Sequence, residues 1–201
     1  MNTRSKTGNG ARPSSRIAAL RRDEILAGAQ VTIRRLGLRR VGMRQIARAA
    51  GLSLGNLYYY FRNKEELVYF CQAQTLDRLL EVVLEARQGY GAHGQVAALI
   101  RGHLRVVLGG GDAMHLEFDN LPPALYRKLV RKRDEYEREV RALIAAGQKR
   151  GVLRDGDPKL IAFHVLGAIN WAARWFRPDG EYTVDAVADH FAEQICGGIA
   201  K

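Results

Sequence analysis

Residues 44–61, RQIARAAGLSLGNLYYYF, combine side chains that can hydrogen-bond to phosphates and base edges with a spacing typical of short helices. Apolar residues recur at helical intervals on both sides of Gly51, a residue type that accepts the left-handed conformation in which helices end. Ser53 can then cap a second helix, on which Leu57 and Phe61 share a buried face. The polar residues of that helix remain outside. This layout is that of a helix-turn-helix, whose second helix enters the major groove of DNA.

Three consecutive tyrosines, Tyr58 to Tyr60, argue against the alternative interpretation, which is a buried helical hairpin. A helix cannot turn three neighbouring residues inward, so at least one of these rings must be exposed. Arginines precede the tyrosines on the same motif. We expect Arg40, in the loop before the motif, to meet phosphates. We expect Arg44, in the first turn of the first motif helix, to reach the DNA backbone or the groove edge.

The charge of the chain is concentrated around this motif. Residues 1–64 carry 14 Lys and Arg against 2 Asp and Glu, a formal charge of +12, whereas the remainder carries −1. A merely solubilising surface would spread the charge more evenly. An anionic membrane surface would also attract basic residues, but this segment lacks an amphipathic basic helix with an exposed apolar face. The segregation therefore favours the phosphate backbone of nucleic acid as the partner.

From Ile25 to Lys64 the chain resembles the DNA-binding domain of the tetracycline-repressor (TetR) family. The resemblance rests on an apolar helix ending in Leu36 and Gly37, on the segments MRQIARAAG and LGNLYYYF, and on the run NKEEL that follows. It implies an N-terminal three-helix DNA-binding domain and a C-terminal helical domain for ligand binding and dimerisation. It also implies that Ser53, Leu54, Gly55 and Asn56 approach base edges, and that Tyr58, Tyr59 and Lys64 hold phosphates.

The residues themselves also predict an all-α fold, because no alternating apolar run is long enough to argue for a sheet. We divide the chain into a disordered basic arm (residues 1–15), the helix-turn-helix domain (16–63) and a ligand-binding and dimerisation domain (64–201). The arm adds phosphate or minor-groove contacts, or is a dispensable leader. It is not followed by an apolar signal core, and no apolar run is long enough to span a membrane, so no membrane partner is expected. Cys71 and Cys196 fit buried thiols in a reducing cytoplasm.

Apolar stripes and cap residues predict five helices in the C-terminal part: residues 64–87, 95–108, 124–150, 157–176 and 183–199. The resemblance implies that the first of these joins the two domains, so that its tilt sets the spacing of two DNA readers. Opposite charges stand four apart along residues 124–150, and we interpret them mostly as a solvated face rather than a binding patch.

The helix at residues 157–176 is apolar almost all round, which predicts burial on several sides. It carries small residues, among them Gly167 and Ala168, that allow close helix crossing. We therefore expect this helix and residues 183–199 to pair with their copies in a second chain as a four-helix bundle. The family resemblance implies the same homodimer.

The C-terminal part also holds more large apolar side chains than one small core needs, which suggests a pocket for a small effector. The residues are Met114, Phe118, Tyr126, Phe163, Trp171, Trp175 and Phe176. The run WAARWFRPDGEY resembles family members that answer to acyl-coenzyme A (acyl-CoA) thioesters in lipid or aromatic-acid catabolism. Such an effector needs cations for its phosphates, for which we consider Arg174, Arg177, Arg101 and Arg105. The alternative effector is a hydrophobic drug, in a regulator that controls an efflux pump. Such a drug needs an apolar pocket but no cations.

Catalytic and metal chemistry is not indicated. The five histidines form no spacing typical of a metal site, and the chain has no phosphate-binding loop after a strand and no nucleophile elbow. A helical enzyme or scaffold remains the weaker alternative, because neither explains the charge segregation. The sequence thus predicts a cytoplasmic, homodimeric regulator without cofactor, which binds a palindromic operator as a repressor or, alternatively, an activator.

Overall fold

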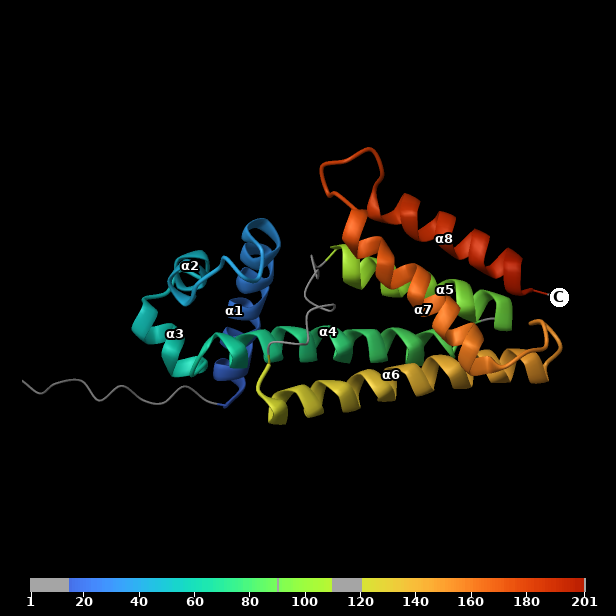
Figure 1. Ribbon diagram of the computed structural model, residues 1–201, viewed down its shortest axis with the longest axis horizontal. Helices are drawn as coiled ribbons and strands as arrows, with labels where there is room; N and C mark the ends of the chain where they lie inside the picture. The colour runs from blue at the N-terminus through green and yellow to red at the C-terminus, as the bar shows by residue number, and fades with distance from the viewer. Residues whose placement is uncertain (1–14, 90, 110–120, 201) are drawn as a thin grey trace, which may run out of the picture.

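The computed structural model describes residues 15–89, 91–109 and 121–200. The predicted basic arm before Ser15, and the proposed effector residues Met114 and Phe118, lie outside this range. The described residues form eight α-helices and one π-helical turn, without a named strand, so the all-α prediction is confirmed (Figure 1). The helices are α1 (Ser15–Leu36), α2 (Met43–Ala49), α3 (Leu54–Tyr60), α4 (Lys64–Ala86), α5 (Ala92–Leu104), α6 (Pro123–Lys149), α7 (Pro158–Trp175) and α8 (Val184–Ile199), with the π-helical turn at Arg105–Gly109.

Four of the described helices, α3, α4, α7 and α8, begin at a side chain that accepts a hydrogen bond from a free backbone N–H group. The Asn63 side chain accepts a hydrogen bond from the Glu66 backbone N–H at 2.8 Å, and this cap starts α4. Asp157 and Thr183 cap α7 and α8 in the same way, as the sequence predicts. Gly37, which follows α1, has a φ of +82°, so the predicted glycine ending of that helix is also confirmed.

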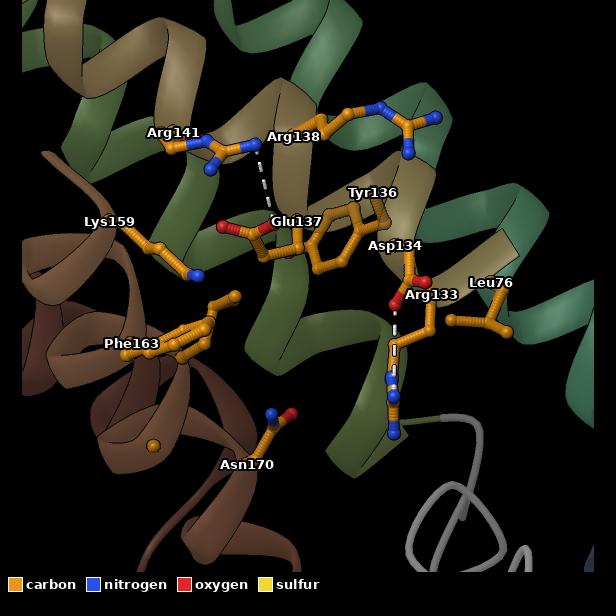
Figure 2. Close-up of a pocket in the computed structure, with 12 residues that line it drawn as sticks. Leu76, Arg133, Asp134, Tyr136, Glu137, Arg138, Arg141, Lys159, Phe163 and Asn170 are labelled. Carbon is orange, nitrogen blue, oxygen red and sulfur yellow. Dashed lines mark ion pairs between the residues drawn. The ribbon is translucent and has the colours of Figure 1, made fainter. Parts of the chain in front are cut away.

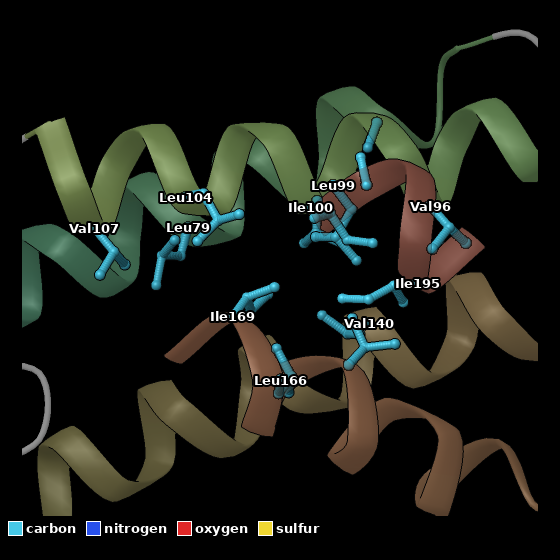
Figure 3. Packing of buried hydrophobic residues seen from close by; sticks show 14 of the residues in the cluster. Leu79, Val96, Leu99, Ile100, Leu104, Val107, Val140, Leu166, Ile169 and Ile195 are labelled. Atoms are coloured by element: carbon cyan, nitrogen blue, oxygen red, sulfur yellow. The ribbon is translucent and has the colours of Figure 1, made fainter. Parts of the chain in front are cut away.

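Two separate hydrophobic cores divide the described chain. One gathers α1, α2, α3 and the first turns of α4, with Ile46, Leu57 and Phe61 fully buried. The other is built by α5, α6, α7, α8 and the remainder of α4 (Figure 3). In Figure 1, α4 runs as a continuous helix from the first group into the second, with α6 alongside it. The two cores are therefore joined by one helix that belongs to both.

The first helix departs from its predicted core face at one end. Ile25, Ala29 and Ile33 are buried as expected, but Leu20 is 59% exposed. The prediction for Leu20 was wrong because the core of this domain begins one turn later, at Ile25 and Leu26. Along the described chain, no helix is long and apolar enough to cross a membrane.

α4 and α5 cross closely at Gly102. A Cβ atom at this position would lie 2.5 Å from Cγ1 of Val82 on α4, which is closer than two carbon atoms can pack. By contrast, a Cβ atom on Gly94, on the same helix, would meet nothing within 4 Å. Gly102 is thus required for this crossing, whereas Gly94 is not.

We predict that Gly102→Ala lowers the free energy of unfolding by about 1–3 kcal/mol, the usual cost of overpacking a core. The matched control Gly94→Ala should raise it by about 0.5–1 kcal/mol, because alanine favours the helix at an uncrowded site. Urea denaturation followed by circular dichroism measures both. A Gly102→Ala variant as stable as Gly94→Ala would contradict the close crossing.

Candidate DNA interface and effector cavity

α3 presents one polar face to solvent and buries the other. The Ser53 hydroxyl accepts a hydrogen bond from the Asn56 backbone N–H at 3.1 Å, which fixes the start of the helix. Leu57 is completely buried against α1 and α2, as predicted. On the opposite side Gly55, Asn56, Tyr58 and Tyr59 are exposed, and Tyr59 keeps 69% of its surface in solvent. The proposed base-reading and phosphate-binding residues of α3 therefore share one accessible face, with Leu54 half-buried at its start.

The turn before α3 is held by its backbone. Gly51 has a φ of +64°, and the following Leu52 N–H donates to the Ala47 carbonyl at 2.9 Å. This arrangement satisfies a carbonyl at the end of α2 and sets the angle between α2 and α3. Arg44, in the first turn of α2, and Arg40, in the loop before it, are both exposed. The predicted helix-turn-helix is thus formed with its arginines free to reach a polyanion.

Lys64 has a structural contact that the sequence did not indicate. Its Nζ donates to the Leu38 carbonyl at 2.5 Å, across 26 residues of chain. The bond ties the start of α4 to the loop between α1 and α2. An ammonium group carries three donors, so this bond leaves donors for a phosphate, the role that the family resemblance implies. No local sequence signal reveals such a contact, because it depends on how the helices pack.

A cavity of about 800 Å³ lies between α4, α6 and α7 (Figure 2). Its apolar wall comes from Leu76 on α4 and from Phe163 and Leu166 on α7. The remaining lining is mostly polar, and it includes four cations and two carboxylates. These are Arg133, Arg138, Arg141 and Lys159, against Asp134 and Glu137.

Two ion pairs of this lining are long. Arg141 lies 3.8 Å from Glu137, and Arg133 lies 3.7 Å from Asp134, both longer than a good charge-assisted hydrogen bond. Lys159 sits 5.6 Å from the centre of the Phe163 ring, and Figure 2 shows its ammonium group directed towards the cavity. The lining therefore carries an excess of two positive charges beside an apolar wall.

Beneath the cavity, three helices are joined by a buried polar cluster. His103 on α5 is fully buried and lies 2.8 Å from the Tyr136 hydroxyl and 3.1 Å from Oδ1 of Asn170. Burial raises the pKa of Tyr136 well above its ordinary value, so its hydroxyl stays protonated and can donate to His103 Nδ1. The two contacts place both ring nitrogens of His103 within hydrogen-bonding distance of a polar partner. The prediction that the histidines are surface or satisfied core residues holds for His103.

Only one of the described effector residues predicted from the sequence lines the cavity, namely Phe163. Trp171, Arg174 and Trp175 follow Asn170, the last α7 residue of the lining, and are exposed. Trp171 keeps 62% of its surface in solvent, with the Arg174 guanidinium 5.3 Å from its ring centre. These three residues do not line this cavity in the single chain, and their part in effector binding stays a prediction.

The cations proposed for the effector phosphates also lie elsewhere. Arg101 of α5 pairs with Asp189 of α8 at 2.6 Å, and Arg105 of the π-helical turn pairs with Asp185 of α8 at 2.7 Å. The hydrogen bond and the charge of Asp185 raise the pKa of Arg105. The cations at the cavity come instead mostly from α6, whose charges we interpreted as a solvated face. The sequence could not indicate their role, because it does not reveal that α7 packs beside them. Among the described residues, no group of side chains could hold a metal ion.

Comparison with known families matches most of the chain. Residues 25–69 match the family described as "Bacterial regulatory proteins, tetR family". Residues 91–199 match "Tetracyclin repressor-like, C-terminal domain". The two matches fall on either side of the middle of α4, one on each hydrophobic core.

Individual relatives agree with this assignment. The chain is 30% identical over 187 residues to the HTH-type transcriptional repressor KstR2 of Rhodococcus jostii (strain RHA1), covering 90% of this chain and 92% of the relative. Among solved structures, the TetR family transcriptional regulator PfmR from Thermus thermophilus superposes with a TM-score of 0.79 at 28% identity, covering 86% of this chain and 97% of that one. AibR, solved in complex with isovaleryl coenzyme A and operator DNA, gives a TM-score of 0.74 at 24% identity, covering 87% and 97%.

The exposed face of α3 leads to a prediction that separates positioning from base reading. Tyr58→Phe should weaken binding to all DNA sequences alike by about 1 kcal/mol, since one hydrogen bond to a phosphate is lost. Asn56→Ala should instead relax the preference for one base pair, because an amide can pair an adenine edge. Electrophoretic mobility shift with a randomised operator library measures both effects. A change of sequence preference in Tyr58→Phe at unchanged total affinity would overturn the phosphate assignment.

Proposed function

The chain belongs to the TetR family of bacterial regulatory proteins, and on that basis we propose that it is a homodimeric repressor released from operator DNA by an acyl-CoA thioester. The observation that carries the effector assignment is the cavity of about 800 Å³, in which an apolar wall stands beside four cations. We also propose that the regulator acts in the cytoplasm, where bacterial operators are accessible.

The DNA-binding half of the proposal rests on the exposed face of α3 and on the charge around it. Asn56 and Gly55 would read base edges, and Tyr58, Tyr59 and Lys64 would hold phosphates. The +12 charge of residues 1–64 supports a strong electrostatic contribution to binding. Arg40 and Arg44 would add to it from the loop before α2 and from its first turn.

An acyl-CoA combines the two features that the cavity can recognise. Its acyl chain would pack against Leu76, Phe163 and Leu166, and its phosphates would meet cations at the edge of the cavity. AibR, which shares the fold, was solved with isovaleryl coenzyme A, and this supports the choice of ligand class.

A lipophilic cation is the second candidate effector, and one observation favours it. Oε1 of Glu137 is buried without a hydrogen-bond partner among the described residues, in a cavity that also holds the Phe163 ring. A carboxylate beside an aromatic ring suits an organic cation. Against this, the four cations of the lining outnumber its two carboxylates, so the charge balance favours an anionic ligand.

The proposed mechanism passes through α4. Leu76 lies in the cavity wall and Leu67, nine residues earlier on the same helix, is buried in the DNA-binding core. A ligand that favours one position of Leu76 would therefore also favour one tilt of α4. The protein would then leave the DNA through a population shift. The favoured state would space the two α3 helices of the dimer so that they no longer match successive major grooves.

The proposed dimer rests on the exposed apolar face of α7. Leu160 keeps 66% of its surface in solvent, and Phe163, Trp171 and Trp175 are also exposed. The helix was predicted to be buried on several sides, and in the single chain this face is open. A second copy of α7 and α8 would cover it, which is the arrangement that the sequence predicts.

We predict that a medium- or long-chain acyl-CoA dissociates the protein from its operator, whereas the free acid and free coenzyme A do not. The free acid lacks the phosphates and free coenzyme A lacks the chain, so each loses one of the two recognised features. Fluorescence anisotropy of labelled operator, titrated with a panel of acyl-CoAs and lipophilic cations, measures release. Release by the cations alone would reject the thioester and keep the regulator.

We predict that Trp171→Glu converts a solution dimer into a monomer, because it would bury an unpaired charge at the interface between copies. The variant should keep its fold, since Trp171 is exposed in the single chain. Leu84→Glu, an exposed apolar residue of α4, is the matched control and should remain a dimer. Sedimentation velocity measures all three proteins. A wild-type monomer at micromolar concentration would contradict the dimer.

A further inference from the structure

A second hollow, which we call the α6 groove, lies on another side of α6 from the apolar wall of the effector cavity. It measures about 680 Å³ and lies between Tyr69 of α4 and the outer surface of α6. Its α6 residues comprise four cations, Lys128, Arg131, Lys132 and Arg138, and two carboxylates, Asp134 and Glu135. Asp134 and Arg138 line both the groove and the effector cavity, so the two hollows meet at these residues.

The cations of the groove differ in whether they form an ion pair within the protein. Lys132 forms an ion pair with Asp77 of α4, which ties the two helices together. For Lys128, Arg131 and Arg138, the described part of the chain offers no ion pair within 4 Å. Figure 2 shows the Arg138 side chain extending away from the centre of the effector cavity. Three cations are thus available to an anion that approaches from outside α6.

The groove also contains an aromatic ring, and this distinguishes it from an ordinary basic surface. Tyr69 is half-buried, and its ring packs edge to face against Phe70 at 5.1 Å between ring centres, so its orientation is held. A fixed aromatic ring beside several cations is a combination that binds nucleotides, because the ring stacks on the base and the cations bind the phosphates.

We propose that the α6 groove binds the nucleotide end of the effector while the acyl chain occupies the cavity. The adenine ring would lie against Tyr69, and the phosphates would meet Lys128, Arg131 and Arg138. The pantetheine arm would pass the shared residues Asp134 and Arg138. This inference rests on the proposed acyl-CoA function and assigns its phosphate-binding residues, none of which lies on the apolar wall.

The groove has a regulatory consequence, since it is built by both α4 and α6. A nucleotide held there would bridge Tyr69, close to the DNA-binding core, and the cations of α6. Its binding would therefore act on α4 directly, in addition to the acyl chain at Leu76. The DNA backbone is the other polyanion that could use these cations, and the experiment must separate the two.

The test compares an acyl-CoA with the matched acyl-pantetheine, which keeps the chain and the thioester but lacks the nucleotide. In the double variant Lys128→Ala, Arg131→Ala, isothermal titration calorimetry should show acyl-CoA affinity reduced by about tenfold or more, as expected for lost charge-assisted hydrogen bonds. Affinity for acyl-pantetheine should stay within about twofold of the wild-type value, a change well under 1 kcal/mol. Lys149→Ala is the control, because Lys149 is exposed on the same helix, about 27 Å from Arg131.

Each other outcome overturns the inference in a recognisable way. Equal loss of both ligands in the double variant would mean that Lys128 and Arg131 act on the cavity rather than on the nucleotide. Unchanged acyl-CoA affinity with weakened operator binding would assign them to the DNA backbone, and unchanged affinity for both would leave them no role. Failure of the proposed function is separately visible, because the wild-type protein would then bind neither thioester.

Discussion

The structure depends on one constraint, which is that α4 is buried in two cores at once. Leu67 and Cys71 are fully buried among α1, α2 and α3, and Leu79 and Val83 are fully buried among α5, α6 and α7. Neither core can lose its part of α4 without exposing large apolar side chains, each worth on the order of 2 kcal/mol. The helix between them is continuous, so a change of tilt imposed at one end reaches the other.

Polar contacts also attach α4 to the DNA-binding domain and to α6. At its start, Lys64 holds the Leu38 carbonyl at 2.5 Å, and Gln74 donates to Asp23 of α1 at 3.1 Å. Further along, Asp77 pairs with Lys132 of α6. The first two contacts attach α4 to the DNA-binding domain and the third attaches it to α6. These contacts lie in order along one continuous helix, so α4 links α6 to α1 through polar contacts as well as through the two cores.

The sequence predicted the parts of the fold that depend on local signals. Gly51 takes its positive φ and Ser53 its capping bond because both are decided within a few residues, and the polar face of α3 follows from helical spacing alone. The cavity could not be predicted, because Arg133 and Lys159 are brought together only by the packing of α6 on α7. The same spacing that suggests ion pairs on a wet face of α6 is compatible with a ligand site. Trp171, whose size suggested a pocket, lies exposed on α7 in the single chain.

The weak pairing of the α6 charges is what makes a ligand site there physically reasonable. Arg133–Asp134 and Arg141–Glu137 are separated by 3.7 and 3.8 Å and are partly exposed, and such pairs contribute about 0–1 kcal/mol. A ligand that enters the cavity would therefore separate these pairs at little cost. The ion pairs within α6 would therefore compete little with a ligand, whereas the Lys132–Asp77 pair joins α6 to α4 outside the cavity lining.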